Sequence, residues 1–215
     1  LLRSITLLMA GLLAACEPSA AQAPQPAPSS DNAGTASDSG VAIFAGGCFW
    51  CTESDFDKIP GVIETTSGYI GGHVENPTYE QVSTGRTGHY EALQVEYDPA
   101  RVSYGRLLDV FWRNIDPLDA AGQFCDKGPH YRAAIFVADE SQRALAEASK
   151  AALDKSGRLP GRIVTEILPA AVFYPAEAYH QDYFLQHPNQ GYCAFVVGPK
   201  VEKFQRVFAQ HLRAD

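Results

Sequence analysis

The segment Gly46-Gly47-Cys48-Phe49-Trp50-Cys51 has the residue types and the spacing of a reactive thiol site. An apolar, β-rich run at 41–45 leads into two glycines, which permit a sharp turn before a helix-like stretch. The first turn of such a helix leaves backbone N–H groups unpaired, and their partial positive charge favours a thiolate over a neutral thiol. We therefore expect Cys48 to be a nucleophile. Cys51 follows one helical turn later and is placed to attack an oxidised Cys48.

A pair of cysteines at this spacing has other uses, which the residues alone leave open. A C-x-x-C pair can be a catalytic dithiol or a stable structural disulfide, and the disulfide is a serious competitor in a secreted protein. Zinc binding is a weaker interpretation, because Cys125 and Cys193 are solitary and supply no second C-x-x-C. We expect neither a metal nor another cofactor.

Residues 1–15 have the features of a secretory signal segment. Arg3 supplies a positive charge, and the apolar stretch after it is too short to span a bilayer. This stretch ends in Leu13-Ala14-Ala15-Cys16, which resembles the lipobox of bacterial lipoproteins, so we expect Cys16 to carry a lipid. Ordinary secretory cleavage near the alanines, with Cys16 lost or idle, is the alternative.

The segment 16–40 is rich in Ala, Pro, Ser and Gln and lacks aromatic residues, so we expect a flexible tether followed by one globular domain at 41–215. We expect this domain to lie outside the cytoplasm, in the bacterial periplasm or cell envelope, and to meet a membrane only through the lipid. The net charge of −8, without a Lys/Arg cluster, excludes a nucleic-acid binder. We expect a monomer.

The globular part must hold the thiol segment between strands and helices. Period-two alternation and β-branched residues predict strands at 41–45, 62–70, 91–97, 132–138 and 162–168. Helical spacing predicts helices at 48–58, 104–115 and 139–156, one beginning near 175 and one from 199, with an irregular loop at 116–130. Because several strands alternate, we expect an α+β fold, a single-domain two-layer sandwich with helices packed on a mixed, largely antiparallel sheet.

Many short motifs in this region resemble, in order, those of the A type of peptide methionine sulfoxide reductase. These motifs are spread over nearly the whole of the region 41–203. They are Gly46-Gly47-Cys48-Phe49-Trp50, Gly68-Tyr69-Ile70-Gly71-Gly72, Asn76-Pro77-Thr78-Tyr79, Thr87-Gly88-His89-Tyr90-Glu91-Ala92, Tyr97-Asp98-Pro99, Gln123-Phe124-Cys125-Asp126, Tyr131-Arg132 and Ala176-Glu177-Ala178-Tyr179-His180-Gln181.

The resemblance implies that residues 41–215 are a catalytic domain that reduces methionine sulfoxide, of the S epimer, in proteins and as the free amino acid. It implies that Cys48 attacks the sulfoxide sulfur and becomes a sulfenic acid, and that Glu91 donates a proton to the oxygen. A carboxyl group in an apolar site stays neutral and can do this. The resemblance further assigns substrate contacts to Phe49, Trp50, Tyr79, Asp126 and Tyr131. We expect His180 to serve in packing and hydrogen bonding.

The sulfenic acid needs a second thiol, and here the chain departs from the commoner family pattern. Many members have glycine where this chain has Cys51, and they use a cysteine near the C-terminus, a location that Cys193 resembles. We prefer Cys51 as the resolving cysteine, with Cys193 second and Cys125 third. The resemblance implies that a thioredoxin-like dithiol then restores the thiols.

Two other functions compete with sulfoxide reduction. A thiol–disulfide exchange protein would use the same C-x-x-C pair but has no need of Glu91 or of the tyrosines. A secreted binding module would hold Cys48 and Cys51 in a structural link. Neither alternative reduces methionine sulfoxide, so an activity assay separates them.

Overall fold

The computed structural model of the chain describes residues 39–209. The expected signal segment, the expected lipidation site at Cys16 and all but the end of the expected tether lie outside these residues. Among the described helices, none has the length and apolar composition needed to cross a membrane.

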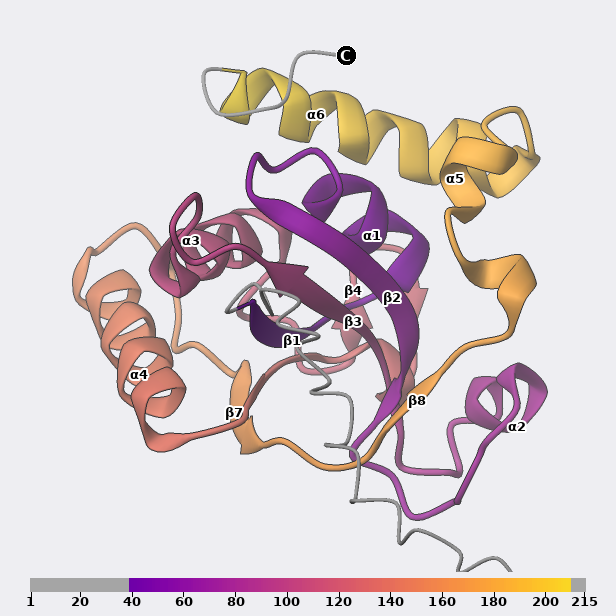
Figure 1. Cartoon of the computed structure of the whole chain (residues 1–215), viewed down its shortest axis with the longest axis horizontal. Helices are drawn as coiled ribbons and strands as arrows, with labels where there is room; N and C mark the ends of the chain where they lie inside the picture. Colours follow the sequence, from indigo (N-terminus) through magenta and orange to yellow (C-terminus); the bar gives the residue numbers. More distant parts are fainter. Residues whose placement is uncertain (1–38, 210–215) are drawn as a thin grey trace, which may run out of the picture. The chain divides into compact units, whose positions relative to one another are not determined.

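A six-stranded sheet forms the centre of the fold, in the order β7-β6-β1-β3-β2-β8 (Figure 1). Its strands are β1 (Gly40–Gly46), β2 (Val62–Ile70), β3 (Tyr90–Tyr97), β6 (Ala133–Val137), β7 (Glu166–Pro169) and β8 (Phe173–Pro175). Only β6 and β7 pair in parallel among these strands, and the other neighbours are antiparallel. Two short strands, β4 (Gly122–Gln123) and β5 (Asp126–Lys127), form a separate hairpin. The mixed, largely antiparallel sheet confirms the predicted fold class.

Within residues 39–209, six α-helices surround the sheet (Figure 1). They are α1 (Phe49–Phe56), α2 (Tyr79–Ser83), α3 (Tyr104–Asn114), α4 (Glu140–Lys155), α5 (Tyr183–Gln186) and α6 (Gly198–Phe208). Side-chain caps fix where α3 and α4 begin: Ser103 Oγ accepts the Arg106 N–H at 3.2 Å, and Asp139 Oδ1 accepts the Gln142 N–H at 2.8 Å. A π-helical turn, Cys193–Val197, leads directly into α6.

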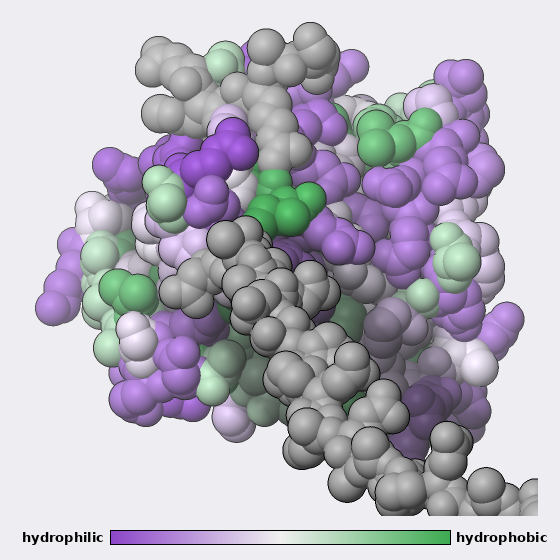
Figure 2. Space-filling view, viewed as in Figure 1, coloured by the Kyte–Doolittle hydropathy of each residue, from purple (hydrophilic) through white to green (hydrophobic). Residues whose placement is uncertain are grey.

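The alternation of β1 divides its side chains between the two faces of the sheet. Ala42 and Phe44 point into the main core, which also receives apolar side chains from α1, α3, α4 and α6. Ile43 and Ala45 belong to a smaller apolar cluster of the sheet. On the face of the molecule shown in Figure 2, hydrophobic residues occur as scattered patches among hydrophilic ones.

Most predicted elements are present, but the segment after β7 is not as predicted. The strand expected at 162–168 begins only at Glu166, because the chain meets β6 there. The prediction of a helix that begins near residue 175 was wrong. Phe173–Pro175 is an edge strand that pairs with Ile70 to Gly68 of β2, and a single 3₁₀ turn follows at 178–180. Proline is tolerated there because an edge strand has an unpaired side.

Candidate active site

Cys48 lies where β1 ends and α1 begins, as the sequence predicts. Gly47 between them has φ +90°, and a Cβ there would lie 2.7 Å from the Gln123 Cβ, so the turn requires glycine. Cys48 is the N-cap residue of α1, and its carbonyl oxygen accepts the Cys51 N–H at 3.1 Å. The junction therefore fixes the direction of the Cys48 side chain.

The thiol of Cys48 is buried, with 5% of the residue exposed. Burial raises the pKa of Cys48 well above its usual value, and the neighbouring Cys51 thiol raises it further, whereas a hydrogen bond with Tyr192 lowers it. In the substrate-free structure, burial therefore opposes the thiolate that the helix N-terminus is expected to favour.

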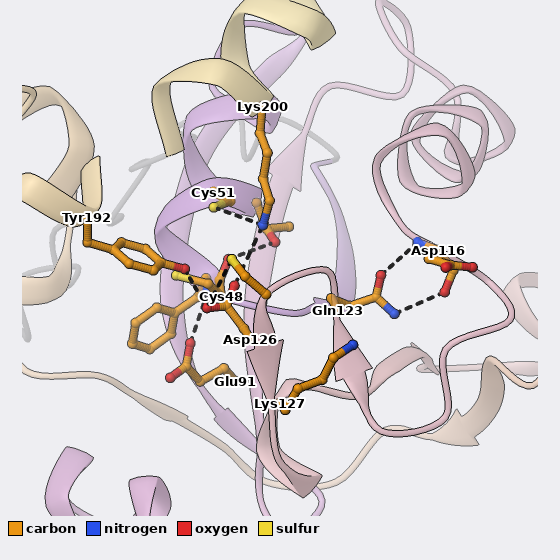
Figure 3. Close-up of polar contacts among 12 residues, drawn as sticks. Cys48, Cys51, Glu91, Asp116, Gln123, Asp126, Lys127, Tyr192 and Lys200 are labelled. Atoms are coloured by element: carbon orange, nitrogen blue, oxygen red, sulfur yellow. Dashed lines mark hydrogen bonds and ion pairs between the residues drawn. The ribbon is translucent and has the colours of Figure 1, made fainter. Parts of the chain in front are cut away.

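Glu91 on β3 approaches the same helix start from the sheet. Its residue is 1% exposed, and its Oε2 accepts the backbone N–H of Phe49 at 3.1 Å (Figure 3). Burial, and then the proximity of Cys48, raise the pKa of Glu91 well above its usual value, although the Phe49 N–H acts in the opposite direction. These surroundings favour the neutral, protonated form of the Glu91 side chain.

A cavity of about 160 Å³ opens beside these two groups. It is lined by Cys48, Phe49, Trp50, Tyr79, Glu91, Tyr131 and Tyr192. Its walls are aromatic, and its polar groups are a thiol, a carboxylic acid and three phenols. Burial raises the pKa of Tyr79 and Tyr131, so both phenols keep their protons and can donate hydrogen bonds.

Contacts from distant parts of the chain hold the two predicted tyrosines. Tyr79 begins α2, whose N-cap Thr78 forms a capping box with Gln81, and the Tyr79 N–H donates to Glu177 Oε1 at 2.8 Å. Tyr131 ends the 3₁₀ turn at 129–131. The structure thus brings Tyr79 and Tyr131 to the Cys48 cavity from different elements.

Asp126, which the resemblance places with the substrate contacts, does not line this cavity. Its Oδ1 accepts a hydrogen bond from the Tyr192 hydroxyl at 2.8 Å, and its Oδ2 lies 3.6 Å from Lys200 Nζ (Figure 3). In this structure, then, Asp126 contacts the cavity through Tyr192. Tyr192 and Lys200 were not predicted as site residues, because each reaches the site from the C-terminal segment and contacts residues that are distant in the sequence.

The described cysteines are all free thiols. Cys51 and Cys193, the first two candidates for the resolving role, are near Cys48. Cys51 and Cys193 share one apolar cluster with Cys48, and Cys193 is fully buried in the π-helical turn. Cys125 is exposed, with its Sγ 3.9 Å from Asp126 Oδ1. The arrangement places Cys51 and Cys193 together with Cys48.

His180 packs against the aromatic wall, and its Nδ1 accepts the Trp50 indole N–H at 3.1 Å. Trp50 also stacks on Tyr183 of α5, with ring centroids 3.8 Å apart. Within residues 39–209, no three His, Cys, Asp or Glu side chains are grouped so that they could hold a metal ion.

Comparison with known proteins gives consistent results for sequence and structure. A family model described as "Peptide methionine sulfoxide reductase" matches residues 40–212. The chain is 56% identical over 147 residues to the peptide methionine sulfoxide reductase MsrA of Halalkalibacterium halodurans, covering 68% of this chain and 84% of that protein. The MsrA of Bacillus licheniformis is 51% identical over 164 residues, which cover 76% of this chain and 90% of that protein.

Solved structures resemble the fold over a similar range. Methionine sulfoxide reductase A of Corynebacterium diphtheriae matches with a TM-score of 0.65 and 36% identity, over 75% of this chain and 80% of that chain. Mxr1 from Saccharomyces cerevisiae in reduced form matches with a TM-score of 0.64 and 32% identity, over 72% of this chain and 89% of that chain.

Proposed function

The chain belongs to the peptide methionine sulfoxide reductase family and is an oxidoreductase of that type, and we propose that Cys48 and Glu91 carry out the reduction together. The Cys48 sulfur attacks the sulfur of methionine sulfoxide while Glu91 donates its proton to the oxygen. The S–O bond of the substrate breaks, its oxygen passes to the Cys48 sulfur as the hydroxyl group of a sulfenic acid, methionine leaves, and the thiol proton replaces the one that Glu91 gave. Cys48 sulfur is oxidised and the substrate sulfur is reduced.

The observation that carries this proposal is a buried thiol and a buried neutral acid lining one aromatic cavity. A sulfoxide oxygen leaves poorly unless it is protonated, and a neutral carboxylic acid supplies the proton. The methyl and methylene groups beside the sulfoxide suit the aromatic walls formed by Phe49 and Trp50. The phenols of Tyr79 and Tyr131 can donate hydrogen bonds to the polar S–O group.

We propose that Cys51 resolves the sulfenic acid, with Cys193 as the alternative. Condensation of the Cys51 thiol with the Cys48 sulfenic acid forms a disulfide and releases water. Cys51 is one helical turn from Cys48, and the two thiols interact in the resting protein. A thioredoxin-like dithiol then reduces the disulfide. We further propose that the substrates are the S epimer of methionine sulfoxide in oxidised proteins and the S epimer of the free amino acid.

Reduction of separated S and R methionine sulfoxide, driven by dithiothreitol, tests the function. We expect the parent to convert the S epimer, Cys48→Ser to be inactive, and Cys125→Ser, which changes an exposed cysteine, to keep the parent rate. A parent that reduces neither epimer but exchanges disulfides would instead be a thiol–disulfide exchange protein.

Peptide mapping after one turnover should find a Cys48–Cys51 bridge, and a dominant Cys48–Cys193 bridge would contradict our choice of resolving cysteine.

We also propose that Cys16 is lipidated and holds the protein at the cell envelope, outside the cytoplasm. The support is the lipobox-like Leu13-Ala14-Ala15-Cys16 after an apolar stretch. A Cys16→Ser variant should move from the membrane fraction to the soluble fraction. Retention of that variant with membranes would contradict the anchor.

A further inference from the structure

Lys200 is a cation at the candidate site for which the proposed reaction gives no role. It lies in the first turn of α6, and 24% of its side chain is exposed. Its Nζ is 3.8 Å from Cys51 Sγ, 3.6 Å from Asp126 Oδ2 and 4.7 Å from the centre of the Phe124 ring (Figure 3). Burial lowers the pKa of Lys200, but the neighbouring Cys51, Asp126 and Cys48 outweigh burial and raise it, so its ammonium group keeps its charge.

Cys51 and Lys200 share a cavity that is distinct from the substrate cavity. This second cavity, of about 240 Å³, lies among residues of α1, the end of α3 and α6, and no residue lines both cavities. Its lining includes Phe124 and Val207, which are 43% and 54% exposed, so the cavity reaches the surface. Cys48 lines the substrate cavity only, whereas Cys51 lines the second cavity only.

The two thiols of the proposed disulfide therefore have different surroundings. Cys48 lines the cavity that has aromatic walls and Glu91. Cys51 lines a cavity that reaches the surface, and an ammonium group lies at hydrogen-bonding distance from its sulfur. An adjacent cation stabilises a thiolate, which is the nucleophilic form.

We propose that Lys200 stabilises the Cys51 thiolate as it attacks the Cys48 sulfenic acid. In this step Cys51 loses its proton to water in the second cavity, the S–S bond forms, and the S–O bond of the sulfenic acid breaks. The hydroxide that leaves takes up a proton from solvent water, which balances the proton that Cys51 released, and becomes water, while the Cys51 sulfur is oxidised and the Cys48 sulfur is reduced. Lys200 stays protonated throughout. This inference rests on the proposed function and on Cys51 as the resolving cysteine.

Lys200 could instead serve only to attach α6 through its ion pair with Asp126, so the test must separate charge from packing. The variant Lys200→Met removes the charge, and Lys200→Arg keeps it. Lys203→Met is the matched control, because Lys203 is on the same helix and lines the same cavity, whereas it is Lys200 whose Nζ lies beside the Cys51 sulfur. Each reduced protein is mixed with a peptide containing S-methionine sulfoxide, without reductant, and quenched over time.

Two products are measured in each sample: the methionine-containing peptide, and the Cys48–Cys51 disulfide by mass spectrometry, with dimedone to trap the sulfenic acid. We expect Lys200→Met to form methionine at the parent rate, which also shows that it folds, but to form the disulfide about tenfold more slowly and to accumulate trapped Cys48. Lys200→Arg should recover most of the rate, and Lys203→Met should match the parent.

Unchanged disulfide formation in Lys200→Met would overturn the inference, as would an equal loss in Lys200→Arg or equal slowing of both products. A parent that forms methionine but a Cys48–Cys193 bridge would overturn it and leave the reductase proposal standing. A parent that forms no methionine would overturn both.

Discussion

Cys48 and Glu91 are two acids that line one aromatic cavity and are both buried. Burial raises both pKa values, and the proximity of Cys48 raises that of Glu91 further, whereas the Cys51 thiol raises that of Cys48. Both shifts favour the neutral thiol and the neutral carboxylic acid in the resting site. In the proposed reaction, the sulfoxide oxygen accepts the Glu91 proton while the Cys48 sulfur attacks, and the thiol proton passes to the carboxylate that this leaves, so neither group has to carry a charge before substrate binds.

Replacing Glu91 tests its role as the proton donor. Glu91→Gln should lower the rate of sulfoxide reduction by about 10²-fold or more, because an amide is a poor acid, while the fold is kept by an amide oxygen that can still accept the Phe49 N–H. Single-turnover methionine formation measures this rate. Glu96→Gln, on the same strand but partly exposed, is the control and should behave as the parent. Parent-like activity in Glu91→Gln would rule out the assigned role.

The neutral state of Cys48 has its own chemical consequence. Without substrate, Cys48 should react slowly with iodoacetamide at neutral pH and faster as pH rises, because the fraction of thiolate increases toward its raised pKa. The exposed Cys125 in the same sample is an internal reference. Peptide-level mass spectrometry measures both rates. Modification of Cys48 at neutral pH as fast as that of Cys125 would show that the helix end, and not burial, governs this thiol.

The sequence was sufficient for the residues that lie in local motifs but not for those that reach the site through the fold. The glycines and Cys48 share one turn, so their placement could be predicted. Tyr192 and Lys200 reach the site from the C-terminal segment, and they follow Cys48 by 144 and 152 residues in the sequence. The neutral thiol was also missed, since helix-end charge is readable from sequence whereas the depth of burial depends on α5 and α6.

At the scale of elements, α1 is unusual because its polar side chains are buried along with its apolar ones. The sheet covers one side of the helix, and α5 and α6 contact it as well (Figure 1). Its buried polar residues are Thr52, Glu53, Ser54 and Asp55. This explains why the helix has little amphipathic pattern and why its limits could be predicted mainly from the flanking glycines and Pro60.

Glu53 makes the stability of this element depend on pH. Burial, and then the nearby Asp57, raise the pKa of Glu53 from 4.5 to about 8, and its Oε1 accepts the Ser67 hydroxyl at 3.1 Å. Above about pH 4.5 the unfolded chain releases this proton while the folded chain retains it, so rising pH reduces stability until the folded group ionises near pH 8. The folded protein therefore loses the advantage of this neutral side chain between these two values.

Glu53→Gln removes that dependence, because the amide does not titrate. The variant should be as stable as the parent near pH 4 and more stable at pH 8, by on the order of 2 kcal/mol in the free energy of unfolding. Urea unfolding followed by circular dichroism at both pH values measures the difference. Glu64→Gln, at an exposed position on β2, should show no such change. A variant less stable than the parent at pH 8 would mean that Glu53 is ionised in the folded protein.

Short elements escaped prediction because tertiary contacts, and not local pattern, define them. The five residues of α2 are too few for helical spacing to show, and a hydrogen bond to Glu177, 98 residues away, holds their start. The three residues of β8 become a strand only by pairing with β2. The long elements α3 and α4 have caps and repeated apolar positions, which is why their predicted limits agree with the structure to within about two residues.

For the whole domain, one aromatic side chain links the sheet to the helices that surround the site. Phe44 is fully buried in β1, between β3 and β6, four residues before Cys48. Its ring lies 5.2 Å from the rings of Phe56 on α1 and Phe111 on α3, and 6.2 Å from that of Tyr104. The strand that leads to Cys48, the proposed nucleophile, is thus held by the same core that fixes α1.

Phe44→Ala should therefore lower the stability of the whole domain and not only that of β1. Loss of the ring leaves a cavity among three aromatic residues that belong to two helices, and we expect a decrease of about 3–5 kcal/mol in the free energy of unfolding. Phe195→Ala is the matched control, because Phe195 is 84% exposed and its loss should cost less than about 0.5 kcal/mol. Urea unfolding should be followed by far-ultraviolet circular dichroism and by tryptophan fluorescence, which reports on Trp50 beside the site and Trp112 on α3. Coincident transitions, both shifted to lower urea, would show that the site and the core unfold together. A shift seen by one probe alone would show instead that β1 and the site form a separate cooperative unit.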